Sequence, residues 1–217
     1  TFRLVAPEMT GDLPNNTFLV NTHLTKVMLQ IPKVTRLGGY WKRTGYDNFM
    51  AETDVSDWDL AAVQKLYHHD GNVEDRKANS WLFRFSKFRG TMRLPALQIL
   101  NAHAFINCPN MAALEAGRNG TLEYVGYSAV TNCPALGSVV LGGAAAGWTI
   151  SSNAFNAVNL TNVTFLTTSP AYEETETVIF GTAEGLVGLV PPALFRTARE
   201  QWLVCGRSPV LRHAVRA

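Results

Sequence analysis

Three groups of side chains in this sequence could do chemistry. Cys108 and Cys133 stand in two similar stretches, "NCPNMAALEAG" and "NCPALGSVVLGG", and paired thiols can bind a metal or form a disulfide. The polar stretch "HHDGNVEDR", residues 68–76, could ligate a metal through its histidines and carboxylates. Residues 54–59 hold three aspartates, which could serve acid–base chemistry or bind calcium.

The sequence favours a structural explanation for each group. No histidine lies at ligand spacing beside either cysteine, so the thiols are predicted to be buried as small apolar groups. Adjacent histidines on a strand point to opposite sides, so His68 and His69 could both bind one metal only from an irregular loop. The stretch is instead predicted to be a solvated loop in a degenerate repeat. Asp57 and Asp59 flank Trp58, as expected for the exposed positions of a strand.

Catalysis is not indicated elsewhere in the chain. The glycine-rich stretch "LGGAAAGW", residues 141–148, lacks the lysine of a phosphate loop and is predicted to allow a tight turn between coils. The sequence contains no Ser-His-Asp set, zinc signature or cofactor fingerprint. We therefore predict that the protein is not an enzyme and has no cofactor and no metal site.

Composition limits the classes of partner. The 217 residues, 47% of them hydrophobic, are sufficient for one core of ordinary size. A formal net charge of +2 does not indicate a nucleic-acid partner. No apolar run approaches the roughly 18 residues of a membrane span. The three cysteines, an odd number, argue against a disulfide framework.

The elements that position these residues follow a repeat. The pairs at 104–105, 129–130 and 154–155, Ala-Phe or Ala-Val, are each 25 residues apart, as are Cys108 and Cys133. Three units align on this spacing: "AHAFINCPNMAALEAG", "YSAVTNCPALGSVVLG" and "SNAFNAVNLTNVTFLT". A fourth unit, "NNTFLVNTHLTKVMLQI", matches the first of these at an offset of 87 residues.

Each unit contains a strand pattern of the Leu-x-x-Leu-x-Leu type. Repeats of about 20–29 residues with this pattern are leucine-rich repeats. The strand buries one face against the neighbouring coil, so successive coils must stack. The sequence therefore predicts a mainly β repeat solenoid of leucine-rich repeats, with about 25 residues and one short strand per coil.

The full unit resembles the BspA-like leucine-rich repeats of bacterial surface proteins. It reads apolar-x-x-Ile/Val-Gly-x-x-Ala-Phe-x-x-Cys-x-x-Leu-x-x-Val-x-Leu, and the resemblance covers roughly residues 4–168 and is sharpest over 94–166. It implies an extracellular or cell-surface location and a role in adhesion or host interaction. The cysteine is replaced by Asn21 in the first unit and by Val158 or Asn159 in the last, which indicates that it fills space.

The chain is predicted to divide into two parts. Residues 1–168 form the solenoid, with irregular insertions at about 38–93, and residues 169–217 form a C-terminal cap or tail. In the second part, residues 193–204 could form a short amphipathic helix with proline at its start.

Binding is predicted on the exposed strand face in the irregular middle of the chain. The regular coils expose Ala, Gly, Ser and Thr, whereas charged and aromatic residues gather in the middle. A protein or glycan ligand, host-derived if the protein is an adhesin, would contact the following candidates: Asp57, Asp59, Arg89, Arg93, Trp41 and Trp81. The alternative is that the repeats are a spacer within a larger surface protein and bind no ligand.

Overall fold

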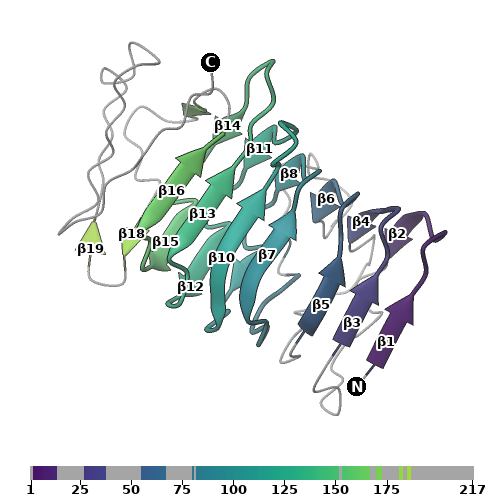
Figure 1. Cartoon of the computed structure of the whole chain (residues 1–217). Coiled ribbons are helices and arrows are strands. Elements are labelled where there is room, and N and C mark those ends of the chain that lie inside the picture. The colour runs from purple at the N-terminus through teal and green to yellow at the C-terminus, as the bar shows by residue number, and fades with distance from the viewer. Residues whose placement is uncertain are drawn as a thin grey trace, which may run out of the picture.

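The chain winds into a parallel β-solenoid, in which strands from successive coils lie side by side (Figure 1). The computed structural model describes residues 2–13, 27–37, 55–66, 80, 82–151, 153–166, 170–172, 181–182 and 185–186. This described part contains no helix, and about four of its coils are spaced by roughly 25 residues. The predicted mainly β repeat solenoid is confirmed.

The strands line three sides of the coil. Two parallel sheets form the first side, one of them with β1 (Phe2–Val5), β3 (Val27–Gln30) and β5 (Val55–Asp59). The other contains β7 (Gly90–Leu94), β10 (Met111–Ala116), β13 (Ser138–Leu141) and β16 (Asn162–Phe165). A seven-stranded sheet forms the second side, with β2 (Gly11–Leu13), β4 (Val34–Leu37), β6 (Lys65–Leu66), β8 (Ile99–Leu100), β11 (Tyr124–Val125), β14 (Thr149–Ile150) and β17 (Ala171–Tyr172). A three-stranded sheet forms the third side, with β9 (Phe105–Ile106), β12 (Val130–Cys133) and β15 (Phe155–Val158). A separate two-stranded sheet pairs β18 (Gly181–Thr182) antiparallel with β19 (Gly185–Leu186).

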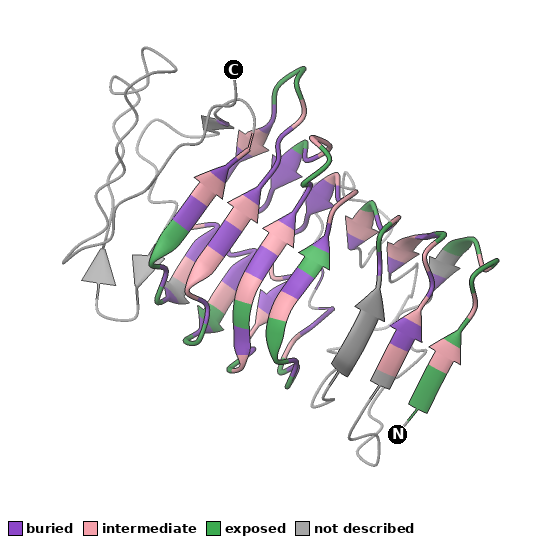
Figure 2. Cartoon of the chain, in the orientation of Figure 1, coloured by how far each residue is buried: buried purple, intermediate pink, exposed green. Residues whose placement is uncertain are grey.

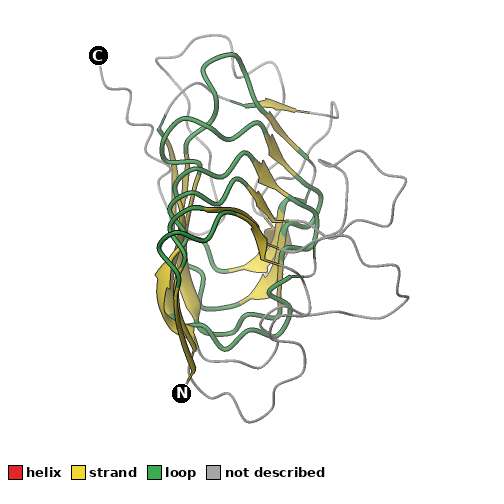
Figure 3. Ribbon diagram, turned by 90° about the vertical axis from the view of Figure 1, so that its right-hand side faces the viewer, coloured by secondary structure: helices red, strands yellow, loops and turns green. Residues whose placement is uncertain are grey.

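The number of strands per coil differs from the predicted single strand. From β7 to β15 each coil contains three strands, one on each side, and the connections between them stack as well (Figure 3). The additional strands are short, and β8, β11 and β14 have only two residues each. Alternation of apolar and polar residues is visible only over about four residues or more, so the two-residue strands β8, β11 and β14 leave no periodic signal in the sequence.

Buried side chains on the first side form rows that run from coil to coil. In β13, Val139 and Leu141 are buried, while Ser138 and Val140 are partly exposed (Figure 2). Val139 pairs in register with Leu114 of β10 and with Val163 of β16, and both are fully buried. Burying a side chain of this size stabilises the fold by about 1.5–3 kcal/mol, so these rows are a main source of stability.

A second buried row lies on the third side of the coil. Phe105, Val130 and Phe155 occupy register positions on β9, β12 and β15, as the 25-residue spacing predicted. The backbone N–H of Phe105 donates to Ala129 O at 2.9 Å, which fixes this register. Phe83 extends the row by one coil, because its ring stacks on that of Phe105 with centroids 4.8 Å apart.

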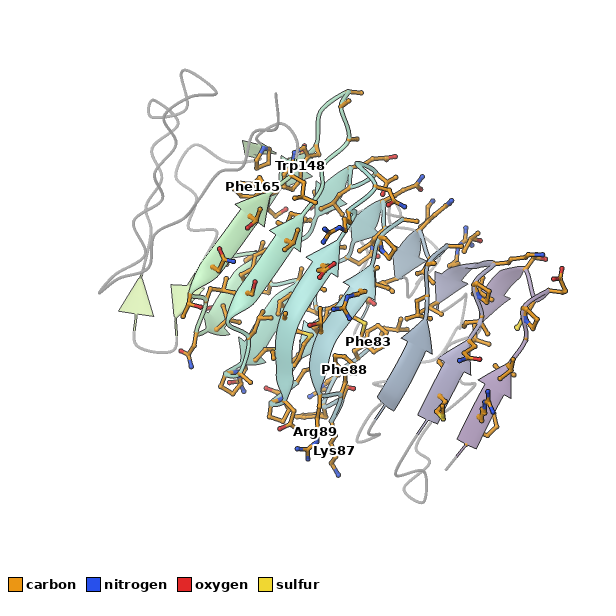
Figure 4. All side chains as sticks on the ribbon, in the orientation of Figure 1. Phe83, Lys87, Phe88, Arg89, Trp148 and Phe165 are labelled. Carbon is orange, nitrogen blue, oxygen red and sulfur yellow. The ribbon has the colours of Figure 1, made fainter. Side chains whose placement is uncertain are left out.

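The glycine-rich stretch at 141–148 lies where neighbouring segments approach most closely. A Cβ atom added to Gly142 would lie 2.2 Å from Gly117 O in the preceding coil, and one added to Gly143 would lie 2.1 Å from the Trp148 ring. Trp148 is buried and meets Phe165 edge-on, with centroids 5.7 Å apart (Figure 4). Only residues without side chains fit these contacts, which accounts for the glycines.

The Phe105→Ala variant should lose about 3–5 kcal/mol of unfolding free energy, because the truncation leaves a cavity between stacked coils. Denaturant unfolding followed by far-UV circular dichroism measures the loss. Tyr127→Ala is the matched control, since that ring is half exposed and its removal should cost less than about 1 kcal/mol. An unchanged midpoint for Phe105→Ala would show that this row does not hold the coils together.

The Gly143→Ala variant should lose about 1–3 kcal/mol, because the new methyl group overlaps the Trp148 ring and forces it from its site. Thermal unfolding measures the loss, with Ala145→Ser as an exposed control in the same loop. Equal midpoints for the two variants would contradict the packing described here.

Candidate functional site

The outer face of the sheet β7-β10-β13-β16 presents its side chains in two rows. The pairing register places Thr91, Ala113, Ser138 and Asn162 in one row, and Arg93, Glu115, Val140 and Thr164 in the other. Charged residues occur only at the β7 and β10 positions, so the chemistry of this face is concentrated at one end of the sheet.

Arg93 belongs to a small ion-pair network on this face. Its Nε lies 3.6 Å from Glu115 Oε1, and Arg118 Nη1 lies 3.1 Å from the other carboxylate oxygen, Oε2. The Glu115 side chain is 20% exposed, whereas both arginine side chains are more than half exposed. Exposed pairs of this kind contribute about 0.2–1 kcal/mol each, so they orient the side chains more than they stabilise the fold. One carboxylate shared by two guanidinium groups leaves a net positive charge.

The structure brings only part of the predicted site together. Arg89 is exposed immediately before β7, and Arg93 is exposed within it. The backbone of β5 places Asp57 opposite Met28 and Asp59 opposite Gln30, in a sheet separate from that of β7. The side chains of these aspartates lie outside the described residues, as do Trp41 and Trp81.

The predicted polar loop with His68 and His69 also lies outside the described residues, as do Cys205 and the proposed helix at 193–204. Within the described ranges, no group of three or more His, Cys, Asp or Glu side chains could hold a metal ion. No described helix is long and apolar enough to span a membrane.

A cluster of cations that sequence reasoning missed lies at the corner that leads into β7. This basic corner, residues 84–89, contains a half-buried arginine at 84 and exposed side chains at Phe85, Lys87 and Arg89. Figure 4 shows Lys87 and Arg89 extending outward at the start of β7. The signal was present in the sequence as "RFSKFR", with three bases and no acid, but of these bases only Arg89 is predicted from the sequence as a ligand-binding candidate, on the exposed strand face.

Phe85 stands out within the basic corner. Its ring is 40% exposed, and Arg84 Cζ lies 4.7 Å from the ring centroid, within range of a cation–π interaction. Its backbone adopts a left-handed conformation with φ of 58°, which is an outlier for a bulky side chain. The N–H of Phe85 donates to Ile106 O at 2.8 Å and so holds this conformation against the next coil.

The same position in the next two coils is occupied by asparagine. Asn107 and Asn132 have φ values of 54° and 52°, and Asn132 Nδ2 donates a hydrogen bond to Asn107 Oδ1. Asparagine tolerates the left-handed region better than other residues with a side chain. Asparagine therefore suits the left-handed position of the two Asn-Cys-Pro segments, and Phe85 is the exception in the series.

The cysteines point into the core, as predicted. Cys108 Sγ donates to Phe83 O at 2.8 Å, and Cys133 Sγ donates to Thr131 O at 3.4 Å. Both are free thiols and at most 1% exposed. The neighbouring Cys133 thiol and burial raise the pKa of Cys108, whereas the Cys108 thiol lowers the pKa of Cys133 against the effect of burial. A buried thiol that keeps its proton, as Cys108 does, is a poor nucleophile and a poor metal ligand.

Other small residues take the place of these cysteines in neighbouring coils. Val158 pairs in register with Cys133, and Ser86 follows Phe83 by three residues, as Cys108 follows Phe105. Val158 and Ser86 are both buried. The position therefore requires a small side chain and does not require sulfur.

No protein-family model, no curated protein and no solved structure matches this chain. Its function must therefore be inferred from the geometry and chemistry described above.

Cys108 and Cys133 should resist alkylation by iodoacetamide in the folded protein at neutral pH and react on unfolding, because neither sulfur is accessible. Mass spectrometry of peptides separates their labelling from that of Cys205. Cys108→Ser and Cys133→Val copy the residues of the neighbouring coils and should still fold. Rapid labelling of both thiols in the native state, or stoichiometric zinc in the purified protein, would refute their structural role.

Proposed function

We propose that this chain is a non-catalytic interaction module of a secreted or cell-surface protein, and that its solenoid presents a binding face for a protein or a glycan. The proposal rests on one observation above all. On the sheet β7-β10-β13-β16 the inward positions make the core, and the outward positions form continuous rows that packing leaves free to vary. Such a surface can change its chemistry without loss of the fold.

The rigidity of the face also favours binding. Side chains on paired strands are already ordered, so a ligand that contacts them incurs a smaller entropic cost than one that orders a loop. The cations at the β7 end, Arg89 and Arg93, provide charge-assisted hydrogen bonds to acidic groups of a partner. The resemblance to BspA-like repeats of bacterial surface proteins supports an extracellular location and a role in adhesion or host interaction.

The absence of catalysis is part of the proposal. The two described thiols, which are the strongest potential nucleophiles among the described side chains, are buried and hydrogen-bonded to backbone carbonyl groups. The histidine of the described residues, His103, has a pKa lowered by burial and packs edge-on against Tyr127.

A spacer within a larger surface protein is the second candidate. The outward residues of β13 and β16 favour it, since Ser138, Val140, Asn162 and Thr164 offer no aromatic or charged anchor. The two candidates differ in whether the β7 end of the face binds a ligand.

A glycan array and a panel of extracellular host proteins, probed with the full chain, should reveal a ligand, and Arg89→Ala/Arg93→Ala should weaken its binding at least ten-fold. That loss corresponds to about 1.4 kcal/mol. Asp57→Ala and Trp81→Ala extend the test to the other sequence-predicted candidates.

Lys33→Ala is the control for a lost surface charge. Lys33 is exposed in the turn between β3 and β4 and pairs with Glu8, away from the face under test. A ligand that binds the double variant and the parent equally well would place the site elsewhere, and a screen without any ligand would favour the spacer.

A further inference from the structure

We propose that the basic corner, residues 84–89, binds an anionic polysaccharide through its carboxylate or sulfate groups. This inference rests on the proposed function and names the chemical class of its ligand. Three independent observations support it: the sign and placement of charge, the backbone conformation of Phe85, and the contrast with the equivalent corners of the next coils.

Positive charge is concentrated in this part of the chain. The stretch from 76 to 114 contains six Lys or Arg residues and no Asp or Glu, and three of the six lie in the basic corner. Lys87 and Arg89 are exposed and extend outward beside the start of β7. The planar guanidinium group of arginine can donate two parallel N–H hydrogen bonds to one carboxylate or sulfate group.

The corresponding corners of the following coils are neutral. They contain Asn107 and Pro109 in one coil, and Asn132 and Pro134 in the next, where the basic corner has Phe85 and Lys87. The scaffold at these corners is otherwise the same, with a left-handed residue followed by a buried small one. The charge and the aromatic ring are therefore not needed to turn the chain at this corner.

Phe85 adopts a strained backbone conformation. Asparagine fits the left-handed backbone better, as the next two coils show, and a residue that remains 40% exposed gains less from burial than a fully buried phenylalanine such as Phe83 or Phe105. Backbone strain of this kind is concentrated at functional sites. The ring lies beneath the Arg84 guanidinium, at 4.7 Å, so it holds that cation in place and adds an apolar surface for the carbon face of a sugar.

The arrangement of the cations along the chain favours a linear polyanion as the ligand. The three cations lie within one six-residue segment, a short linear arrangement that a polymer chain can follow. A folded protein partner needs about 800 Å² of surface on each side, and the neighbouring corners at Pro109 and Pro134 offer small neutral residues. Single-stranded nucleic acid is bound by several stacked aromatic rings, and the basic corner exposes one.

The test measures binding of the full chain to dextran sulfate and to polygalacturonate, with neutral dextran as the control polymer. We expect binding to at least one polyanion, weakening as salt concentration rises, and no binding to dextran. Arg84→Gln/Lys87→Gln/Arg89→Gln should bind at least ten-fold more weakly. Arg3→Gln/Lys33→Gln/Arg36→Gln removes three cations outside the basic corner and outside the sheet β7-β10-β13-β16, and the same net charge, and it should bind within three-fold of the parent.

Phe85→Asn separates binding from folding. Its thermal midpoint should equal or exceed that of the parent, because asparagine relieves the left-handed strain, as at Asn107 and Asn132. Its affinity for the polyanion should nevertheless fall at least three-fold, because Arg84 loses the ring that positions it. A lower midpoint with unchanged affinity would assign Phe85 a purely structural role and overturn this part of the inference.

Four outcomes would overturn the inference. Two concern specificity: equal losses in the two triple variants, which would show non-specific attraction, and tighter binding of a single-stranded oligonucleotide, which would show a different ligand class. If no polyanion binds while the array and protein panel yield another ligand, this inference fails and the proposed function stands. If neither experiment yields a ligand, both fail.

Discussion

Backbone hydrogen bonding between successive coils in a fixed register is the interaction on which the rest of this structure depends. The N–H of Phe105 donates to Ala129 O and that of Val130 donates to Ala154 O, each at 2.9 Å. In each bond the acceptor is the residue that precedes the donor's repeat equivalent in the next coil: Ala129 precedes Val130, and Ala154 precedes Phe155. A side chain therefore lies directly above and below side chains from the same place in the repeat, and it must pack against them.

This constraint explains which residues recur. Apolar residues suit the inward positions, because identical neighbours then form a continuous buried row, as Leu114, Val139 and Val163 do. Polar residues suit positions where the backbone is left-handed, because asparagine adopts that conformation at low cost and can bond to the asparagine of the next coil. Where two backbones nearly touch, as at Gly117 and Gly142, the register excludes any side chain.

The register also tolerates coils of unequal length. Thr91 pairs with Ala113, an offset of 22 residues, whereas Ala113 pairs with Ser138, an offset of 25. The difference is absorbed in the connections and at a β-bulge, where β10 steps from Met111 to Ala113 while β7 advances by one residue. Pairing downstream of the bulge is regular, so an irregular coil does not disturb the coils that follow it.

These physical rules determine what could be predicted from the sequence. The rows through Phe105 and Val139 were predictable, since equivalent residues that recur every 24 or 25 positions are brought into register by the stacking of the coils. The two-residue strands were not predictable, because their pairing is imposed by neighbouring coils and not by their own pattern. The basic corner was visible only as composition, and its significance depends on the left-handed φ of Phe85, a tertiary property that no local pattern indicates.

Departures from the repeat differ in meaning according to the side of the coil on which they occur. Inside, Ser86, Cys108, Cys133 and Val158 replace one another at one position, and all are small and buried, so the substitutions conserve the volume of the core. Outside, the change from Asn-Cys-Pro to Phe-Ser-Lys alters charge and exposure and puts a bulky residue into a strained conformation.

Selection for stability alone accounts for the first kind of change and opposes the second. A partly exposed aromatic ring at a left-handed position carries backbone strain that asparagine avoids, and the contact with Arg84 offsets only part of that strain. Left-handed φ also occurs at His103, Ser128 and Asn153, but among the described left-handed residues Phe85 is the one with a bulky apolar side chain. Its position in an exposed, cationic corner is best explained by a requirement of that surface, because the scaffold folds with asparagine at this position in the two coils that follow.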